Sequence, residues 1–240
     1  MRPIIGISCA WSEETWGPTA AVGGYDYVGR AYVEAIYKAG GIPVLLPPIP
    51  DESDIEQYAQ MILDNVDGLY FSGGGNVKGK SITEIPTLYE QQPTRARWED
   101  ALLKLAYEQD VPTLGVCRGY QMMAVAFGGE MDTVRLPEHK QMVPSDQGVH
   151  DVSIAAGSVL AAIVGEGKWH VNSIHVERVK RVPEDFEAVA WADDSSIEAL
   201  AAVKKTFFMG TQFHPELMFT DLRAQSVLGA FVRAAKKRKI

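Results

Sequence analysis

Residues 112–129 read PTLGVCRGYQMMAVAFGG, an apolar run that stops at one cysteine and then continues with helical periodicity. Residues 111–116 predict a short buried strand, and the residues after the cysteine predict a helix. Gly115 and Gly119 flank Cys117 in the pattern Gly-x-nucleophile-x-Gly, which is typical of a sharp turn between a strand and a helix. Because glycine tolerates the backbone conformations of such a turn, this stretch predicts a strand–turn–helix unit with Cys117 at its apex.

Two interpretations of Cys117 follow from this placement. A cysteine at a helix N-terminus lies beside unpaired N–H groups and the positive end of the helix dipole, which favour the thiolate and make it a candidate nucleophile. A cysteine that follows an apolar strand can equally be a small buried hydrophobe. The turn alone leaves both interpretations open, and catalysis requires a base elsewhere in the chain.

Upstream of this unit, apolar β-branched runs alternate with segments of helical periodicity. The expected strands are 3–9, 42–46 and 66–71, the expected helices are 27–39, 53–63 and 97–109, and the expected loops are 10–25 and 78–94. Ser53 and Glu56 have the spacing of a capping box at the start of the second helix. The alternation, with strands too apolar for a one-sided sheet, predicts a parallel sheet covered by helices on both faces.

Downstream, the pattern changes to shorter pieces that are expected to pair partly in antiparallel fashion. The expected strands are 149–154, 171–179, 188–191, 197–203 and 207–212, and the expected helices are 159–164 and 221–235. Neither a repeat nor a low-complexity linker divides the chain. Residues 1–240 are therefore predicted to form one α/β domain with a mostly parallel central sheet and a smaller antiparallel portion in its second half.

The composition argues against several classes of function. The chain has 240 residues, of which 46% are hydrophobic, and a formal net charge of −8, which disfavours nucleic acid or an anionic membrane as the main partner. Its two cysteines, Cys9 and Cys117, both follow predicted strands, so no disulfide framework is implied and a cytoplasmic location is expected. No apolar run is long enough to span a membrane, and the N-terminus predicts a first strand rather than a signal peptide.

A candidate base follows the predicted strand 207–212. His214 opens the sequence His-Pro-Glu, and in an extended segment Glu216 would point to the same side as His214. The carboxylate could then hold one imidazole nitrogen while the other faces outward. Together with Cys117 this predicts a Cys-His-Glu triad, in which Cys117 attacks, His214 moves protons and Glu216 fixes the tautomer.

Two other interpretations of these side chains remain. A His-x-Glu pair is often only a surface hydrogen bond, and histidine, cysteine and glutamate can also bind a metal ion. The sequence contains no CxxC, no HExxH and no clustered pair of histidines, so neither a metal nor a cofactor is expected.

Glycines follow the predicted strand 66–71, in the stretch SGGGN at 72–76. Such a run can be merely a flexible turn, or it can present backbone N–H groups to a developing anion. It is predicted to end at the same edge of the sheet as Cys117, where the carboxyl ends of parallel strands meet.

The stretches GVCRGYQ at 115–121 and GTQFHPE at 210–216 resemble the class I glutamine amidotransferase superfamily. Within it, the chain is most similar to the γ-glutamyl-γ-aminobutyrate hydrolase family. The narrower similarity rests on PIIGI at 3–7, AGGIP at 39–43, GGGN at 73–76, the Cys-Arg-Gly of the turn, and VNSIH at 171–175. The resemblance implies a flavodoxin-like three-layer sandwich and an amidase that opens a small-molecule γ-glutamyl amide through a glutamyl thioester.

The resemblance also implies roles for further residues. Backbone N–H groups of Gly74, Gly75 and Arg118 would hold the oxyanion. The glutamyl part of the substrate would be bound by residues of the turn helix and of the 171–175 stretch, which are Gln121, Asn172, Ser173 and, with a structural role equally expected, His175. No cofactor is implied, and a homodimer is compatible with the resemblance. Two alternatives stay open: a glutaminase subunit that supplies ammonia to a synthase partner, and a non-catalytic binding protein on the same fold.

Some positions depart from the family pattern. Asn76 stands where the hydrolases usually have Asp, Gly79 where Pro is usual, and Val176-Glu177 where His-Gln is frequent. None of these positions belongs to the triad, so they bear on the amine leaving group rather than on acyl transfer. Glu177 leads to the hypothesis that a cationic amine is preferred.

Overall fold

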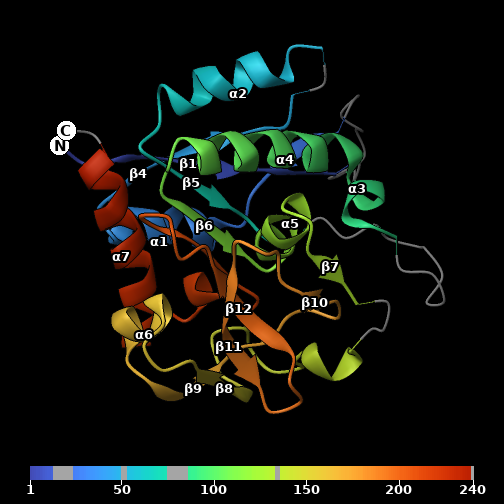
Figure 1. The fold of residues 1–240 in the computed structure, drawn as a ribbon, viewed down its shortest axis with the longest axis vertical. Helices are drawn as coiled ribbons and strands as arrows, with labels where there is room; N and C mark the ends of the chain where they lie inside the picture. The colour runs from blue at the N-terminus through green and yellow to red at the C-terminus, as the bar shows by residue number, and fades with distance from the viewer. Residues whose placement is uncertain (13–23, 50–52, 75–85, 133–135, 239–240) are drawn as a thin grey trace, which may run out of the picture.

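A nine-stranded mixed sheet forms the centre of the computed structural model (Figure 1), which describes residues 1–12, 24–49, 53–74, 86–132 and 136–238. The strands lie in the spatial order β4 (Ile42–Leu46), β1 (Ile4–Ser8), β5 (Gly68–Phe71), β6 (Thr113–Val116), β13 (Phe208–Thr211), β12 (Ile197–Ala201), β11 (Glu187–Ala192), β8 (His150–Ile154) and β9 (Gly167–Val171).

The sheet changes character at β13. The strands from β4 to β13 pair in parallel, and those from β13 to β9 pair in antiparallel fashion. Met209 of β13 is registered with Leu114 of β6 on one side and with Ala201 of β12 on the other. The predicted α/β class is confirmed, and the antiparallel strands extend the same sheet rather than forming a separate one.

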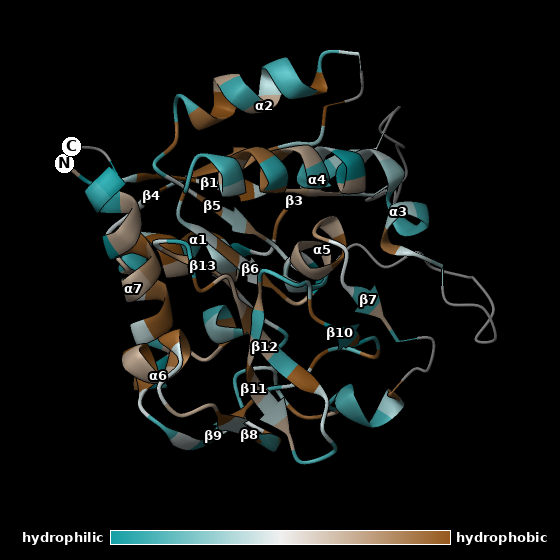
Figure 2. Ribbon diagram, in the orientation of Figure 1, coloured by the Kyte–Doolittle hydropathy of each residue, from teal (hydrophilic) through white to brown (hydrophobic). Residues whose placement is uncertain are grey.

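Helices lie on both faces of the sheet. On one face lie α1 (Arg30–Lys38), α6 (Val159–Val164) and α7 (Leu222–Arg238), and on the other lie α2 (Ile55–Leu63), α4 (Pro93–Glu108) and α5 (Arg118–Ala126). Buried residues of each group join one of two hydrophobic clusters, one per face of the sheet. In Figure 2, brown and teal residues alternate along α4 and α7, as expected of helices that bury one face.

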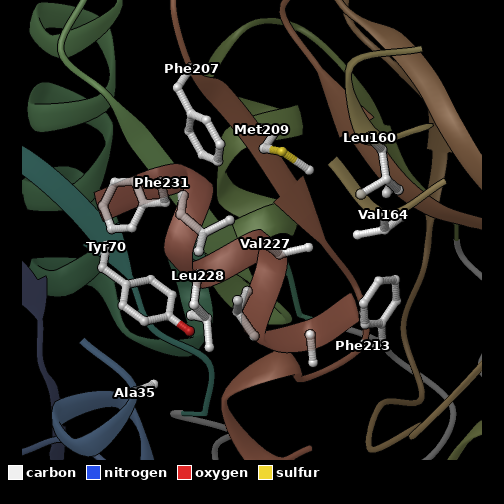
Figure 3. Close-up of a cluster of buried hydrophobic side chains, with 14 of the residues drawn as sticks. Ala35, Tyr70, Leu160, Val164, Phe207, Met209, Phe213, Val227, Leu228 and Phe231 are labelled. Atoms are coloured by element: carbon white, nitrogen blue, oxygen red, sulfur yellow. The ribbon is translucent and has the colours of Figure 1, made fainter. Parts of the chain in front are cut away.

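The strands supply both clusters because their side chains alternate between the two faces. Tyr70 of β5 packs with Phe231 of α7, with ring centroids 6.0 Å apart, and Figure 3 shows this cluster together with Met209, Leu228 and Ala35. Its neighbours along β5 belong to the cluster on the opposite face. No helix in the described parts of the chain is long and apolar enough to cross a membrane.

The predicted loop 10–25 is wrong at both ends. Ala10–Ser12 forms β2 and Tyr25–Tyr27 forms β3, and the two strands pair in antiparallel fashion. Because Tyr27 is engaged in this pair, α1 begins at Arg30 rather than at residue 27. The rest of the loop lies outside the described residues.

The predicted capping box at Ser53 is also wrong. The N-cap of α2 is Asp54, without a side-chain capping bond. A capping box occurs instead at Thr87, inside the predicted loop 78–94: its hydroxyl accepts from the Glu90 N–H at 3.3 Å and its own N–H donates to Glu90 Oε2 at 2.8 Å. It starts the four-residue helix α3 (Leu88–Gln91), which is too short to show a helical period in the sequence.

The predicted strand 171–179 is wrong as well. β9 ends at Val171, and β10 (Val179–Arg181) pairs with β7 (Glu130–Met131) in a separate small sheet. The residues between them turn away because their polar groups bond elsewhere. Ser173, for example, donates its hydroxyl to the His139 carbonyl oxygen at 2.6 Å.

Candidate active site

Cys117 lies at the turn between β6 and α5, where it is the N-cap residue of the helix. Its backbone has φ 54° and ψ −108°, a conformation that L-residues rarely adopt. A Cβ at Gly115 would lie 2.8 Å from the carbonyl oxygen of Gly119, and a Cβ at Gly119 would clash with the carbonyl oxygen of Phe71. The two glycines are therefore required by close packing of the turn on itself and on β5.

His214 and Glu216 follow β13, the parallel neighbour of β6, so they reach the same edge of the sheet as Cys117. His214 caps a 3-10 turn, η2 (Pro215–Leu217), rather than lying in the expected extended segment. This turn still brings the pair together, with His214 Nδ1 2.6 Å from Glu216 Oε1. The side chain of Glu216 is completely buried.

Cys117 and His214 lie side by side. A Cβ placed on Gly73 would be 3.1 Å from Cys117 Cβ and 3.1 Å from His214 Cε1, so both side chains flank the same backbone position. His214 Nε2 is buried and has no oxygen or nitrogen partner among the described residues. The ring interacts instead with the Cys117 thiol, which leaves Nε2 as the nitrogen available for proton transfer.

The surroundings shift both pKa values. Burial raises the pKa of Cys117, but the charge of His214 and its hydrogen bond outweigh burial and lower the pKa below the ordinary value. Burial lowers the pKa of His214, but the charges of Glu216 and Cys117 reverse this and raise it well above its ordinary value. The pair is therefore biased towards a thiolate beside an imidazolium.

Two buried tyrosines complete this group, and neither was singled out from the sequence. Tyr32 accepts a hydrogen bond from the Gly73 N–H at 2.9 Å, and its hydroxyl lies 3.4 Å from His214 Nδ1. Tyr70 donates to Glu216 Oε2 at 3.5 Å. Burial, together with the charge of Glu216, raises both tyrosine pKa values well above the ordinary value, so both remain protonated. In the sequence, Tyr32 appears only as one residue of the apolar face of a predicted helix, and Tyr70 only as one residue of a predicted buried strand.

The glycine run after β5 is held from behind by α4. The guanidinium of Arg95 is fully buried and donates to the carbonyl oxygens of Ser72 at 2.6 Å and Gly74 at 3.0 Å. Its Nε donates to Glu99, which is also fully buried, at 2.7 Å. Gly74 has φ +77° and lines the pocket described below, while Gly75 lies outside the described residues, as do Asn76 and Gly79.

Arg118 is the first residue of α5, so its backbone N–H has no partner within the helix. The side chain points away into the protein: it donates to the Leu88 carbonyl oxygen at 3.0 Å and lies 3.6 Å from Glu99. Burial lowers the pKa of Arg118 to about 10. The part of Arg118 that is available for an oxyanion is therefore its N–H group.

A pocket of about 260 Å³ opens in front of Cys117. Its lining comes from the glycine run, the turn, α5, the loop after β9, the segment after β13 and Lys140. The residues are Gly74, Cys117, Arg118, Gln121, Lys140, Ile174, His175, Val176, Glu177 and His214. The Gln121 amide donates to the Glu177 carbonyl oxygen and to Gln212 Oε1, each at 3.1 Å. The pocket thus brings together Cys117, His214, Gln121 and His175 from the expected site.

Asn172 and Ser173 do not line this pocket. The side chain of Asn172 instead makes two hydrogen bonds with the backbone of His214: it accepts from the His214 N–H at 2.8 Å and donates to the His214 carbonyl oxygen at 3.0 Å. The side chain is completely buried. Its place in the structure is behind His214, where it positions the imidazole.

Four ionisable residues gather behind the pocket wall, which the sequence did not indicate. His139, His150 and His175 surround the buried Glu198, although they are far apart in the chain. No pair of histidines is clustered along the sequence, so this group forms only by folding. His139, His175 and Glu198 offer ligand atoms that could hold a metal ion.

Sequence comparison shows where the chain is related to known proteins. The Peptidase C26 family profile matches residues 3–216. A gamma-glutamyl-gamma-aminobutyrate hydrolase of Escherichia coli O157:H7 is 31% identical over 214 residues, which cover 82% of this chain and 81% of that protein. A Mycobacterium tuberculosis protein described as a candidate glutamine amidotransferase is 32% identical over 233 residues, covering 92% and 72% of the two chains.

Structure comparison gives the same fold. A crystal structure from Thermoplasma acidophilum, described as that of a candidate GMP synthase component, has a TM-score of 0.65 and 17% identity, and covers 100% of this chain and 96% of that chain. At this identity the likeness shows the fold alone. The family assignment rests on the sequence matches: the chain belongs to the Peptidase C26 family and is a hydrolase of the class I glutamine amidotransferase-like type.

Proposed function

We propose that the protein hydrolyses a γ-glutamyl amide to glutamate and a free amine, with Cys117 as nucleophile and a glutamyl thioester as intermediate. The observation that carries this proposal is the buried arrangement of Cys117, His214 and Glu216, in which His214 Nδ1 is held 2.6 Å from Glu216 and its Nε2 is left for the thiol. Nucleophile, base and orienting carboxylate in this order form a triad for acyl transfer.

The reaction needs no group beyond these side chains and water. The Cys117 thiolate attacks the γ-carbonyl carbon, forming a C–S bond and an oxyanion. The oxyanion collapses as His214 gives its Nε2 proton to the leaving nitrogen, which breaks the C–N bond and releases the amine. His214 then removes a proton from water, the resulting hydroxide attacks the thioester, and glutamate leaves as the thiolate is restored.

The oxyanion would be held by backbone N–H groups on two sides of Cys117. One is the N–H of Arg118, which lacks a helical partner. The other is the N–H of Gly74, which lines the pocket; Gly75, to which the resemblance assigns the same role, lies outside the described residues. The contacts of Arg95 and Tyr32 with the glycine run support an oxyanion-binding role, because they fix its backbone before substrate binds. Each N–H group that binds the oxyanion is worth about 3–4 kcal/mol in a transition state.

The leaving-group side of the pocket includes Glu177. Its carboxylate accepts hydrogen bonds from the Gln91 amide at 3.1 and 3.4 Å and lies on the pocket wall. A negative charge there favours an amine that carries a second, protonated nitrogen. The relatives named as gamma-glutamyl-gamma-aminobutyrate hydrolases support a γ-glutamyl amine as the substrate class, and Glu177 bears on which amine is preferred.

A glutaminase subunit is the second candidate, because one relative is described as a candidate glutamine amidotransferase. The two candidates differ in whether turnover requires a partner protein. A free-standing hydrolase turns over γ-glutamyl amines by itself, whereas a glutaminase of the second kind turns over glutamine only with its synthase.

The test is turnover of a panel of γ-glutamyl amides, including glutamine, by the isolated chain. The hydrolase proposal predicts glutamate release from at least one γ-glutamyl amine at a kcat/KM well above that for glutamine. Glutamine turnover that appears only when a synthase partner is added to the chain would favour the second candidate. Stoichiometric alkylation of Cys117 without turnover of any panel member, whether or not a synthase partner is present, would favour a non-catalytic binding protein.

A further inference from the structure

We infer that His139, His175 and Glu198 form a binding site for one Zn²⁺ ion behind the wall of the pocket. The three residues come from separate parts of the fold: His139 from the 3-10 turn η1 (Pro137–His139), His175 from the loop after β9, and Glu198 from β12. All three are buried. The site is distinct from the triad and does not depend on the proposed reaction.

The spacing of the inward-facing atoms matches a zinc site. His139 Nδ1 lies 3.3 Å from His175 Nε2 and 3.7 Å from Glu198 Oε1, and His175 Nε2 lies 3.5 Å from the same oxygen. Ligand atoms bound tetrahedrally to zinc at about 2.0–2.1 Å are about 3.3–3.4 Å apart. A point equidistant from the three atoms therefore lies about 2 Å from each, which is the length of a zinc–nitrogen or zinc–oxygen bond.

The outward-facing nitrogens fix the tautomers that zinc requires. His175 Nδ1 lies 3.1 Å from the Glu177 carbonyl oxygen, which can only accept, so the proton is on Nδ1. His139 Nε2 lies 3.1 Å from Asp194 Oδ2 and donates to that carboxylate. In their neutral forms both rings then direct a lone pair at the shared point, and a carbonyl or carboxylate behind each ligand histidine is the usual support of a metal site.

Glu198 is the independent observation that a cation belongs here. Its side chain is fully buried, and neither carboxylate oxygen accepts a hydrogen bond from any of the described residues. A buried carboxylate that accepts no hydrogen bond is costly, and a cation between it and two imidazole lone pairs removes that cost. Two nitrogens and one oxygen form a donor set that suits Zn²⁺.

The position of the site suggests what the ion does. His175 belongs both to the site and to the pocket lining, and Glu177 is only two residues away. A bound ion would fix this loop against η1 and β12, so its main effect is on stability and on the shape of the pocket wall. No step of acyl transfer is assigned to it.

Zinc binding is best measured on the Cys117→Ala chain, because a thiolate beside His214 could itself bind zinc. After chelator treatment, Zn²⁺ is titrated in competition with a chromophoric chelator, and thermal unfolding is followed with and without the metal. We expect one Zn²⁺ per chain with a Kd below about 1 μM and a higher Tm in its presence.

Variants locate the ion. Glu198→Gln keeps the shape of the side chain and should weaken binding at least about 100-fold, while Asp194→Asn should weaken it about 10–100-fold through His139. His170→Gln is the matched control, because His170 is an exposed histidine paired with Asp151 on the neighbouring strand, and its affinity should equal that of the parent. If Glu198→Gln does not fold, the zinc affinity of Asp194→Asn still tests the site.

Three results would overturn the inference. The first is a Cys117→Ala chain that binds no zinc at micromolar concentration, since a proton shared between the imidazoles would then account for the cluster. The second is an unchanged affinity in both Glu198→Gln and Asp194→Asn. The third is binding that is present in the wild type but lost in Cys117→Ala, because it would assign the ion to the triad.

Discussion

Asn172 holds the backbone of His214 from both sides, accepting from its N–H at 2.8 Å and donating to its carbonyl oxygen at 3.0 Å. The imidazole is thus fixed at its backbone by Asn172 and at its ring by Glu216. The resemblance predicts that Asn172 binds the glutamyl part of the substrate, and in the structure its side chain bonds to the backbone of His214. This relationship separates residues that position His214 from residues that line the pocket.

Asn172→Ala should lower kcat about 10–100-fold with little change in KM, because the base loses its position while the pocket lining is retained. Steady-state kinetics on a γ-glutamyl amide measure both constants. Asn65→Ala is the control, because Asn65 is exposed and its side chain donates to the Met61 carbonyl oxygen at the end of α2. A raised KM with unchanged kcat would instead indicate that Asn172 contacts substrate.

Glu216→Gln should reduce kcat about 10³-fold or more, since the amide cannot stabilise the imidazolium and can hold the wrong tautomer of His214. The exposed Glu184→Gln provides a variant with the same chemical change away from the site. Activity within a factor of ten of wild type in Glu216→Gln would show that Glu216 is not the orienting group.

The lowered pKa of Cys117 predicts selective alkylation. Because the thiolate of Cys117 persists to lower pH than an ordinary thiol while burial raises the pKa of Cys9 to about 11, iodoacetamide at neutral pH should label Cys117 alone. His214 lowers the Cys117 pKa, so His214→Gln should move the alkylation–pH profile to higher pH. Peptide mass spectrometry of the labelled chain provides the measurement, and an unmoved profile would contradict the assigned pair.

Gly119→Ala should destabilise the fold by more than about 3 kcal/mol or prevent folding, because the new Cβ would clash with the carbonyl oxygen of Phe71. Gly229→Ala is the comparison: it lies within α7 and its added Cβ meets only the flexible end of Arg233, so helix propensity should make it neutral or slightly stabilising. Denaturant unfolding measures the free energy of unfolding of both variants, and equal values would refute the packing argument.

Glu177→Gln tests the preference for a cationic amine. Removing the charge should lower kcat/KM for γ-glutamyl amides of diamines about 5–10-fold relative to those of amino acids. The comparison is made on one panel with wild type and variant. An unchanged ratio would remove Glu177 from the basis of specificity.

Local patterns predicted much of the fold. The parallel half of the sheet was predicted from apolar strands that alternate with helices. The turn at Cys117 was predicted from Gly115 and Gly119, and at both positions a Cβ would clash with neighbouring backbone. β4 and α6 were placed at their observed bounds, since 42–46 and 159–164 are bounded by clear breaks in the pattern. These features depend on residues that are close together along the chain, so local sequence patterns can predict them.

Features that depend on distant contacts could not be predicted in this way. The apolar look of 171–179 suggested a strand, but Asn172 and Ser173 bond to segments about 30–40 residues away and end it at Val171. The gathering of histidines around Glu198 likewise depends on distant contacts: β11 pairs with β8 and β12, which carry His150 and Glu198, and the bridge between Lys140 and Ile174 joins the segments of His139 and His175.

The most direct measurement is turnover of the best γ-glutamyl amide by Cys117→Ala beside Cys9→Ala. Cys9 is the matched control, because it is a buried cysteine with a raised pKa and lies outside the pocket. We predict that Cys9→Ala retains activity within a factor of about two, whereas Cys117→Ala falls by about 10⁴-fold or more. Wild-type turnover in Cys117→Ala would contradict the thioester mechanism outright.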